Sequence, residues 1–231
     1  EDDTTLDVLR AMAGPDDTWL DIGAGGGRYA LPLALTAARV RVVEPSPSML
    51  EVLRAGMRGS GIHNIDIHPG RWPLEDADPP TAELALMAHV GYDIEGFAAF
   101  LDAAEAAAAR CVVVRRASGA ARASHALWPE VHGEPRADYP MLPELLTLLV
   151  ARGTAPEIRL VQRGDWGFDS REQVLDASRR LLWVRPVGRK GRLVVRLVLG
   201  RAAERTGQWD YDWTPMRDGR VGWATAGRAG E

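Results

Sequence analysis

Cysteine is almost absent from this sequence, because Cys111 is the only one in 231 residues. A single thiol excludes an internal disulfide and any zinc site built from cysteine ligands. Long apolar runs are absent as well: LVVRLVL, which begins at Leu193, is interrupted by Arg196, so no segment is long enough to cross a bilayer. We therefore expect a cytoplasmic protein with no membrane partner.

The sequence also lacks a strong charge of either sign, with a formal net charge of −4. Residues 171–205 are an exception, since they contain ten basic and three acidic residues. Arginines on amphipathic helices usually form a solvated outer face, and we expect the apolar sides of these helices to pack on a sheet. We therefore expect no nucleic-acid partner.

Strand and helix patterns alternate in the first half of the chain. Buried or alternating apolar residues indicate strands, and apolar residues at helical spacing indicate helices, one of which starts at Ser46 and Pro47. The strands are expected at residues 18–22, 38–44, 64–70, 82–90 and 110–116, and the helices at 6–12, 28–37, 47–58 and 93–109. This alternation predicts a parallel sheet with helices on both faces.

The pattern changes after residue 116. Residues 117–140 are predicted to form one long irregular segment, and such segments in compact domains are usually lids or binding loops. The remaining expectations are a helix at 142–152, a strand at 156–163, basic amphipathic helices near 170–184 and 190–206, and strand-like segments at 208–213 and 220–227.

A glycine-rich turn, in WLDIGAGGGR, follows the first expected strand. Gly23, Gly25 and Gly27 are spaced G-x-G-x-G, whereas the dinucleotide fingerprint G-x-G-x-x-G needs its third glycine where Arg28 stands. Asp21 precedes the turn, and a carboxylate there would repel a pyrophosphate but would attract an ammonium group. The turn therefore favours a ligand with an amino-acid tail over a dinucleotide.

Glu44 ends the second expected strand, 21 residues beyond Gly23. At that distance from a glycine turn, an acid can accept hydrogen bonds from both hydroxyls of a ribose. A ligand that combines a ribose with an amino-acid tail and has no phosphate is S-adenosylmethionine.

The motifs WLDIGAGGGR, VRVVEPSPSMLEVLR and ELALMAHV resemble the successive motifs of class I S-adenosylmethionine-dependent methyltransferases, over roughly residues 18–116. The resemblance implies an α/β fold with a seven-stranded, mostly parallel sheet and helices on both faces. It also implies that the last strand is antiparallel and that extra helices lie between the last two strands.

The same resemblance implies a single domain that spans residues 1–231. Its cofactor-binding half would be residues 1–116 and its substrate half residues 117–231. The substrate half would include a lid segment, 117–140, and a helical insertion at about 170–206.

The resemblance assigns the binding of S-adenosylmethionine, and of its product S-adenosylhomocysteine, to a defined set of residues. Asp21 would face the methionine end of the ligand, and Glu44 would hold its ribose. Gly23 and Gly25 would let the backbone pass beneath the ligand, and His89 would lie near the reactive methyl group. The full set is Asp21, Gly23, Ala24, Gly25, Glu44, Pro45, Met49, Arg71, Trp72, Ala88 and His89.

One position departs from the family pattern. Family members often have an aspartate after the third strand that accepts a hydrogen bond from the adenine amine, and Arg71 stands there in this sequence. Either the neighbouring Trp72 packs on the adenine while a backbone group makes the polar contact, or Trp72 is an ordinary anchor of its loop.

A dense group of polar residues lies in SHALWPEVHGEPR, within the irregular segment. Glu130, His132 and Glu134 alternate, so on an extended backbone their side chains would point the same way. Such a group could be a base with its orienting carboxylate, a metal site of two histidines with carboxylates, or a lid whose charges are only solvated. We expect no metal, catalysis by His132, and substrate contacts from Tyr92, His125, Trp128, Glu130 and Arg136.

The expected chemistry is methyl transfer to an O or N nucleophile of a small molecule. Methyl transfer needs alignment of the reactants, and it needs a base only if the acceptor carries a proton that must leave. His89, at the end of the fourth expected strand, competes with His132 for the role of that base. A homodimer is compatible with the sequence.

Other functions stay open at this point. One is a nucleic-acid or carrier-protein methyltransferase that docks through residues 171–205. Another is a non-catalytic protein that binds S-adenosylmethionine as a sensor. A nicotinamide-dependent oxidoreductase is disfavoured by the glycine spacing.

Overall fold

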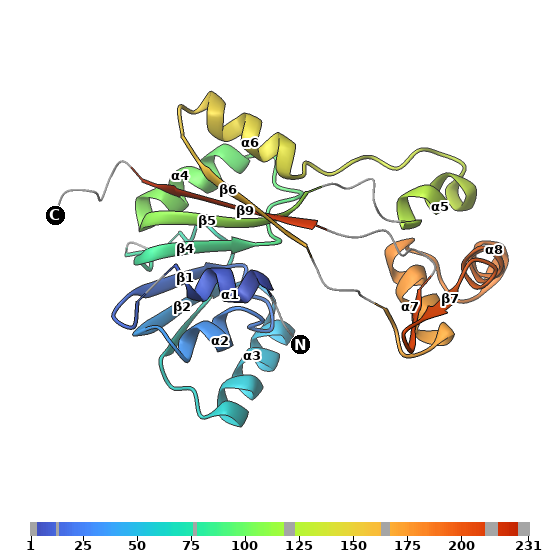
Figure 1. Cartoon of the computed structure of the whole chain (residues 1–231), viewed down its shortest axis with the longest axis horizontal. Coiled ribbons are helices and arrows are strands. Elements are labelled where there is room, and N and C mark those ends of the chain that lie inside the picture. Colours follow the sequence, from blue (N-terminus) through green and yellow to red (C-terminus); the bar gives the residue numbers. More distant parts are fainter. Residues whose placement is uncertain are drawn as a thin grey trace. The chain divides into compact units, whose positions relative to one another are not determined.

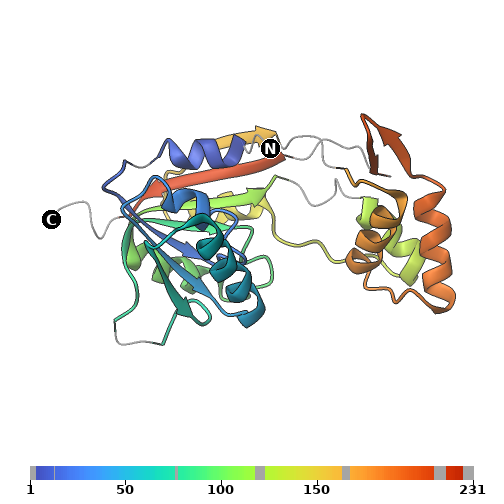
Figure 2. The same ribbon diagram turned by 90° about the horizontal axis from the view of Figure 1, so that it is seen from below.

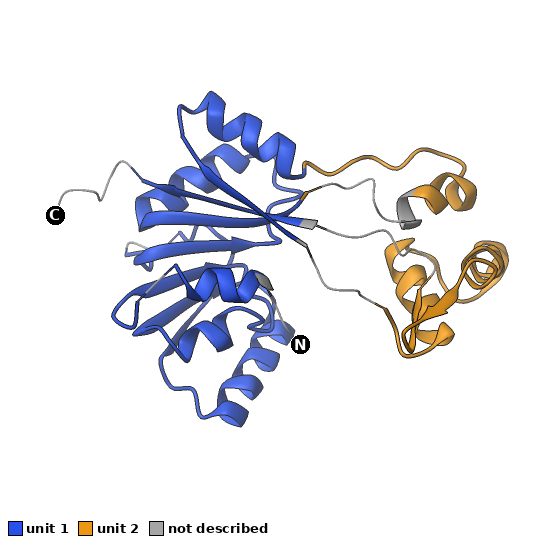
Figure 3. Cartoon of the chain, viewed as in Figure 1, with its two compact units in different colours: residues 1–116, 141–161, 218–231 blue, residues 117–140, 162–217 orange. Residues whose placement is uncertain are grey.

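The computed structural model describes residues 4–12, 14–75, 78–117, 123–162, 167–210 and 217–225. The chain forms two compact units (Figure 3). Unit 1 contains residues 1–116, 141–161 and 218–231, and unit 2 contains residues 117–140 and 162–217. The chain therefore leaves unit 1 after its fifth strand, returns for one helix and one strand, leaves again, and ends in unit 1.

Unit 1 is built on a seven-stranded sheet with strand order β3-β2-β1-β4-β5-β9-β6 (Figure 1). Strands β1 to β5 pair in parallel, and β9 runs antiparallel to β5. This confirms the predicted seven-stranded, mostly parallel sheet with an antiparallel last strand. The strands are β1 Thr18–Ile22, β2 Arg39–Glu44, β3 Ile65–Pro69, β4 Ala82–Ala88, β5 Ala108–Arg116, β6 Glu157–Gln162 and β9 Arg217–Ala224.

Helices lie on both faces of this sheet (Figures 1 and 2). Leu33 and Leu53, from two helices, pack in one core with Leu84 of β4 and Val112 of β5. On β9, the indole nitrogen of Trp223 donates a 2.8 Å hydrogen bond to Glu105 of α4. The helices are α1 Thr4–Arg10, α2 Ala30–Ala34, α3 Pro47–Ser60, α4 Phe97–Ala107 and α6 Leu142–Ala151.

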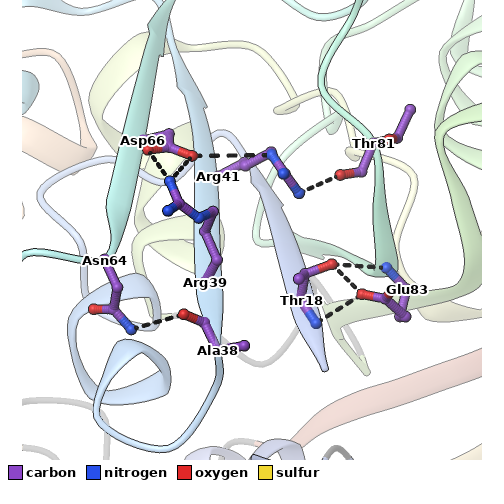
Figure 4. A network of polar contacts seen from close by, with 8 residues as sticks. All are labelled: Thr18, Ala38, Arg39, Arg41, Asn64, Asp66, Thr81 and Glu83. Atoms are coloured by element: carbon purple, nitrogen blue, oxygen red, sulfur yellow. Dashed lines mark hydrogen bonds and ion pairs between the residues drawn. The ribbon is translucent and has the colours of Figure 1, made fainter. Parts of the chain in front are cut away.

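The amino ends of the central strands are joined by polar contacts (Figure 4). The Arg39 guanidinium donates to both carboxylate oxygens of Asp66, at 2.8 and 2.9 Å. Thr18 donates to Glu83 through its backbone nitrogen, at 2.7 Å, and through its hydroxyl. Burial raises the pKa of Glu83, but these hydrogen bonds outweigh it and leave that pKa lowered. This end of the sheet therefore has its charges matched within the chain.

The described residues of unit 2 form three helices and a two-stranded sheet. The helices are α5 Ala123–His132, α7 Arg171–Leu181 and α8 Gly188–Leu199, and the strands are β7 Ala203–Arg205 and β8 Gln208–Asp210. Leu127, Val174, Leu182 and Val198 are buried together in a core of this unit. The extra helices α7 and α8 lie between β6 and β9, as predicted.

Two expectations about these segments are wrong. Residues 123–132 form a helix and not an irregular segment, because Leu127, Trp128 and Val131 recur at helical spacing and pack in the core of unit 2. On a helix, side chains two positions apart point to different sides, so Glu130 and His132 do not share a face as the extended backbone would require.

The basic helices also differ from the prediction. Their apolar sides were expected to pack on a sheet, yet the buried Val174 of α7 and Val194 of α8 belong to the core that unit 2 builds for itself. The second helix also ends at Leu199, and residues 203–205, predicted as its last turn, form β7.

The glycine turn gives a test of this packing. Gly27→Ala is expected to lower the free energy of unfolding by about 1–3 kcal/mol, because its φ of 87° is strained for alanine. Its Cβ would also lie 2.5 Å from Leu53 Cδ1. Gly59→Ala, in α3, is the matched control: it meets nothing within 4 Å, and alanine should stabilise the helix by about 0.5–1 kcal/mol. Urea unfolding followed by circular dichroism measures both, and shifts of the same sign would contradict the analysis.

Candidate active site

A glycine turn joins β1 to α2 at the carboxyl ends of the parallel strands. Gly23 donates its N–H to the carbonyl of Val43 on the neighbouring strand β2, at 2.8 Å. Gly25 adopts a φ of 56°, and a Cβ built there would meet nothing within 4 Å. The backbone at Gly25 is therefore exposed to open space, where a ligand can approach it closely.

Glu44, the last residue of β2, fixes this turn from the side. Its carboxylate accepts a 2.9 Å hydrogen bond from the N–H of Gly25 and a 2.8 Å hydrogen bond from the N–H of Ser46. Ser46 in turn caps α3 by accepting a hydrogen bond from the N–H of Met49. One buried acid thus connects the glycine turn to the start of the next helix, and its remaining lone pairs can still accept hydrogen bonds.

Asp21, in β1 beneath the turn, is buried with 2% of its surface exposed. Burial raises its pKa to about 7, and the negative charge of Glu44 adds to the shift. Its Oδ2 atom has no hydrogen-bond partner within the described part of the chain. No ion pair forms at Asp21 or Glu44 among the described residues, so the turn lies over uncompensated negative charge.

The other residues expected to bind the cofactor lie around this turn. Ala24 is buried in the turn, Pro45 is exposed beside Glu44, and Met49 is 45% exposed in the first turn of α3. Ala88 ends β4, on the strand next to β1. The contacts of these residues with a ligand stay predictions.

Arg71 and Trp72 follow β3, next to Glu44. The N–H of Gly70 donates to the carbonyl of Glu44 at 3.2 Å, and Arg71 is exposed. The Trp72 indole donates a 3.3 Å hydrogen bond to the carbonyl of Phe100 in α4. This contact is the one expected of a loop anchor, and packing of Trp72 on an adenine stays a prediction.

A second polar cluster lies at the carboxyl ends of β4 and β5. His89 follows β4 with a φ of 56°, which is strained for a residue with a side chain. Its Nδ1 is 3.3 Å from the Tyr92 hydroxyl, and its Nε2 is 3.5 Å from Oδ2 of Asp218 on β9. The Tyr92 oxygen also accepts a 3.1 Å hydrogen bond from the N–H of Arg116. Both ring nitrogens of His89 therefore face groups that can orient the ring.

Two residues of this cluster were missed in the sequence analysis. Asp218, 3% exposed, reaches His89 because antiparallel pairing places it opposite Arg116, at the end of β5. Arg115 is buried with its guanidinium over the Tyr92 and Phe97 rings, at 4.5 and 4.9 Å from their centroids. Nothing in the local sequence marks either residue, since the sheet order alone brings them together.

The remaining predicted site residues lie in unit 2. His132 donates its Nε2–H to the Leu182 carbonyl at 2.9 Å, and its Nδ1 is 3.1 Å from the Lys190 ammonium. Trp128 stacks on the His132 ring, with centroids 4.1 Å apart. Both ring nitrogens of His132 and one face of its ring therefore contact residues of unit 2, and its catalytic role stays a prediction.

The polar neighbours of Trp128 have partners in the same unit. Glu130 forms a 3.1 Å ion pair with Arg201. Arg136 lies over the Trp128 ring, 4.9 Å from its centroid. The side chain of His125 lies outside the described residues. Contacts of these side chains with a substrate also stay predictions.

The described residues contain neither a metal-ligand cluster nor a helix that could span a membrane. Within residues 4–12, 14–75, 78–117, 123–162, 167–210 and 217–225, no group of three or more histidine, cysteine, aspartate or glutamate side chains could hold a metal ion. Across the same ranges, no helix has the length and apolar character that a bilayer crossing requires.

Comparison with known proteins identifies a methyltransferase domain model that matches residues 20–105. A curated tRNA (guanine-N(7)-)-methyltransferase of Ruegeria pomeroyi is 33% identical over 64 residues, which are 27% of this chain and 27% of that protein. An uncharacterized protein of Haemophilus influenzae is 32% identical over 80 residues, 34% of this chain and 30% of that protein. The matches thus span less than a third of these relatives' own lengths.

Solved structures show the same fold over nearly the whole chain. The YcgJ protein of Bacillus subtilis superposes with a TM-score of 0.63 at 13% identity, covering 97% of this chain and 99% of that one. The magnesium protoporphyrin IX methyltransferase of Synechocystis, solved with bound S-adenosylhomocysteine, gives a TM-score of 0.57 at 12% identity, covering 96% and 82%. Residues 20–105 of this chain are therefore similar to a methyltransferase domain, and the chain shares its fold with these solved structures.

Proposed function

We propose that this chain binds S-adenosylmethionine at the glycine turn and transfers its methyl group to an acceptor. The observation that carries the proposal is the buried acidic pair, Asp21 and Glu44, which has no cation partner in the described part of the chain. S-adenosylmethionine carries an ammonium and a sulfonium, so it supplies the positive charge that this site lacks. A dinucleotide would bring a pyrophosphate to the same place.

The residues present fit this cofactor. The Asp21 oxygen without a partner is available to an ammonium group, and Glu44 keeps lone pairs for ribose hydroxyls beyond its two backbone hydrogen bonds. The open space above Gly25 allows a ligand to lie against the backbone. The sulfonium supplies an electrophilic methyl group, and the chain supplies its position.

His89 is the proposed base for an acceptor that carries a proton. An O–H or N–H acceptor would have to lose its proton as it takes the methyl group that S-adenosylmethionine would supply. His89 can take that proton at Nε2, which makes no hydrogen bond within the described part of the chain and lies 3.5 Å from the Asp218 carboxylate. Burial raises the pKa of Tyr92, which keeps its hydroxyl protonated and able to orient the ring.

His89 is a better candidate for this role than His132. The Lys190 ammonium lies 3.1 Å from Nδ1 of His132, and the Leu182 carbonyl lies 2.9 Å from its Nε2. With Nε2–H donated to the carbonyl, Nδ1 accepts from the ammonium, so neither nitrogen of His132 has a lone pair left for a substrate proton. His89 Nδ1 likewise lies 3.3 Å from the Tyr92 hydroxyl, but Nε2 of His89 makes no hydrogen bond within the described part of the chain. The lid function of residues 117–140 and the small-molecule nature of the acceptor are part of this proposal.

The first test is ligand stabilisation of the whole chain. S-adenosylmethionine and S-adenosylhomocysteine are expected to raise the melting temperature, and NADH is not. A ligand at 100 times its dissociation constant stabilises the fold by about 2.7 kcal/mol. Differential scanning fluorimetry with the three ligands in parallel measures this. Stabilisation by NADH alone would remove the proposal.

The second test uses the raised pKa of Asp21. A carboxyl whose pKa is raised in the folded state costs stability as pH rises from its unfolded value toward about 7, the folded value. Asp21→Asn removes this cost, so at pH 8 the ligand-free variant should be more stable than the parent by about 1–3 kcal/mol. The gain should be smaller at pH 5.5. The same variant should bind S-adenosylmethionine at least about tenfold more weakly, since a charged partner of its ammonium is lost.

Unfolding curves at both pH values, with calorimetric titration of the ligand, separate the two effects. Asp78→Asn is a suitable control, because Asp78 is exposed and forms no ion pair within the described residues. Loss of stability at pH 8 together with unchanged affinity would show that Asp21 is a structural residue.

The third test concerns the basic residues 171–205. No salt-sensitive binding to tRNA or duplex DNA tighter than about 10 μM is expected near physiological ionic strength. The reason is that several of these arginines already have partners within unit 2. Arg179 pairs with Asp176, Arg201 pairs with Glu130, and Arg171 donates to the Leu199 carbonyl. Mobility shifts over a salt series measure this. Tight binding that Arg189→Ala abolishes would promote a nucleic-acid acceptor over a small molecule.

A further inference from the structure

Strand β6 forms one border of the seven-stranded sheet. It neighbours β9 on one side, and no described strand lies on its other side. Natural sheets usually protect such a border with charged residues, bulges or a covering segment, because its unpaired N–H and C=O groups can pair with another strand. In β6 two exposed apolar side chains alternate with two exposed charged ones.

Ile158 and Leu160 are the apolar residues of this border, with 48% and 55% of their surfaces exposed. They alternate with Glu157 and Arg159, so the apolar pair lies on one face of the strand and the charged pair on the other. Helix α6 leads into β6 (Figure 1) and adds Val150, which is 65% exposed. Unit 1 therefore presents an apolar face and an open backbone edge on the same strand.

We propose that β6 pairs with β6 of a second copy of this chain, antiparallel, about a two-fold axis at Ile158. This register places Ile158 opposite Ile158 of the partner copy, and it places Glu157 opposite Arg159 in both halves of the pair. Glu157 also accepts a 3.0 Å hydrogen bond from Arg220 of its own chain, so its carboxylate would lie between two guanidinium groups. The strand is thus complementary to itself in charge and in apolar character.

Neighbouring registers are less favourable. Moving the axis to Arg159 places two arginines directly opposite each other, which costs energy on a sheet face. Moving the axis to the point midway between Ile158 and Arg159 places Ile158 opposite Arg159. The apolar residues of one strand then lie on the same face of the sheet as the charged residues of the other. The self-complementary register is therefore specific to the sequence of β6.

The expected association is weak. Pairing of one short strand with its flanking side chains buries less than the roughly 1,200 Å² typical of a stable interface. A dissociation constant on the order of 1–100 μM is expected. The dimer does not depend on methyl transfer, so its test is separate from the tests of the proposed function.

Disulfide trapping tests the register. In Ile158→Cys the two thiols lie across the axis, where opposite Cβ atoms are about 4.5–5.5 Å apart, close enough to cross-link on mild oxidation. In Leu160→Cys the two thiols lie four residues apart along the strands, about 13 Å, and should not cross-link. The native Cys111 is buried and does not interfere. Leu35→Cys, exposed beside α2, is the control for random collision.

Sedimentation velocity tests the association itself. The parent chain is expected to shift from monomer to dimer between about 1 and 200 μM. Arg159→Glu, which faces Glu157 of the partner copy, should weaken the dimer at least tenfold. Arg54→Glu, on the exposed side of α3, makes the same charge change away from β6 and should leave the dimer unchanged.

Three results would overturn the proposal. The first is a monomer at every concentration. The second is cross-linking of Leu160→Cys as fast as Ile158→Cys, which would show another register. The third is an Arg159→Glu variant that melts at the parent temperature and dimerises as well as the parent.

Discussion

The burial of two carboxylates at one end of a parallel sheet is the constraint on which the site depends. Asp21 and Glu44 end adjacent strands, and both side chains are removed from water. Glu44 is stabilised by two backbone N–H groups, whereas Asp21 keeps an oxygen without a partner and a pKa of about 7. The ligand-free fold therefore carries an electrostatic cost at neutral pH, and a cationic ligand would relieve it.

The order of the strands determines what lies beside that pair. Parallel β1, β2, β4 and β5 bring their carboxyl ends to one edge of the sheet, where the glycine turn and His89 meet. Strand β9 runs in the opposite direction, so its first residues lie at that same edge and bring Asp218 to His89. At the opposite edge, ion pairs such as Arg39–Asp66 match charges within the chain.

Unit 2 shows how similar residues can serve packing instead. His132 is stacked on Trp128 and bonded through both ring nitrogens, and Glu130 is paired with Arg201. The polarity of this segment resembles that of a catalytic cluster in the sequence. In the structure, the polar side chains of this segment hold α5 against α8 and against the turn after α7. The difference between a base and a packing residue lies in whether a lone pair is left over.

The sequence by itself determined the parallel sheet and the glycine turn, because residues close together in the chain specify both. Alternation of strands and helices predicted the parallel sheet, and the spacing from Gly23 to Glu44 predicted an acid beside the turn. Tertiary structure alone decided which histidine has an acidic partner, since Asp218 is far from His89 in the chain and reaches it only through antiparallel pairing of β9 with β5. It also decided that residues 123–132 form a helix in a separate core, because the apolar partners of Leu127 and Val131 come from α7 and α8. Local patterns are fixed by neighbouring residues, whereas these contacts join distant segments that only the folded chain brings together.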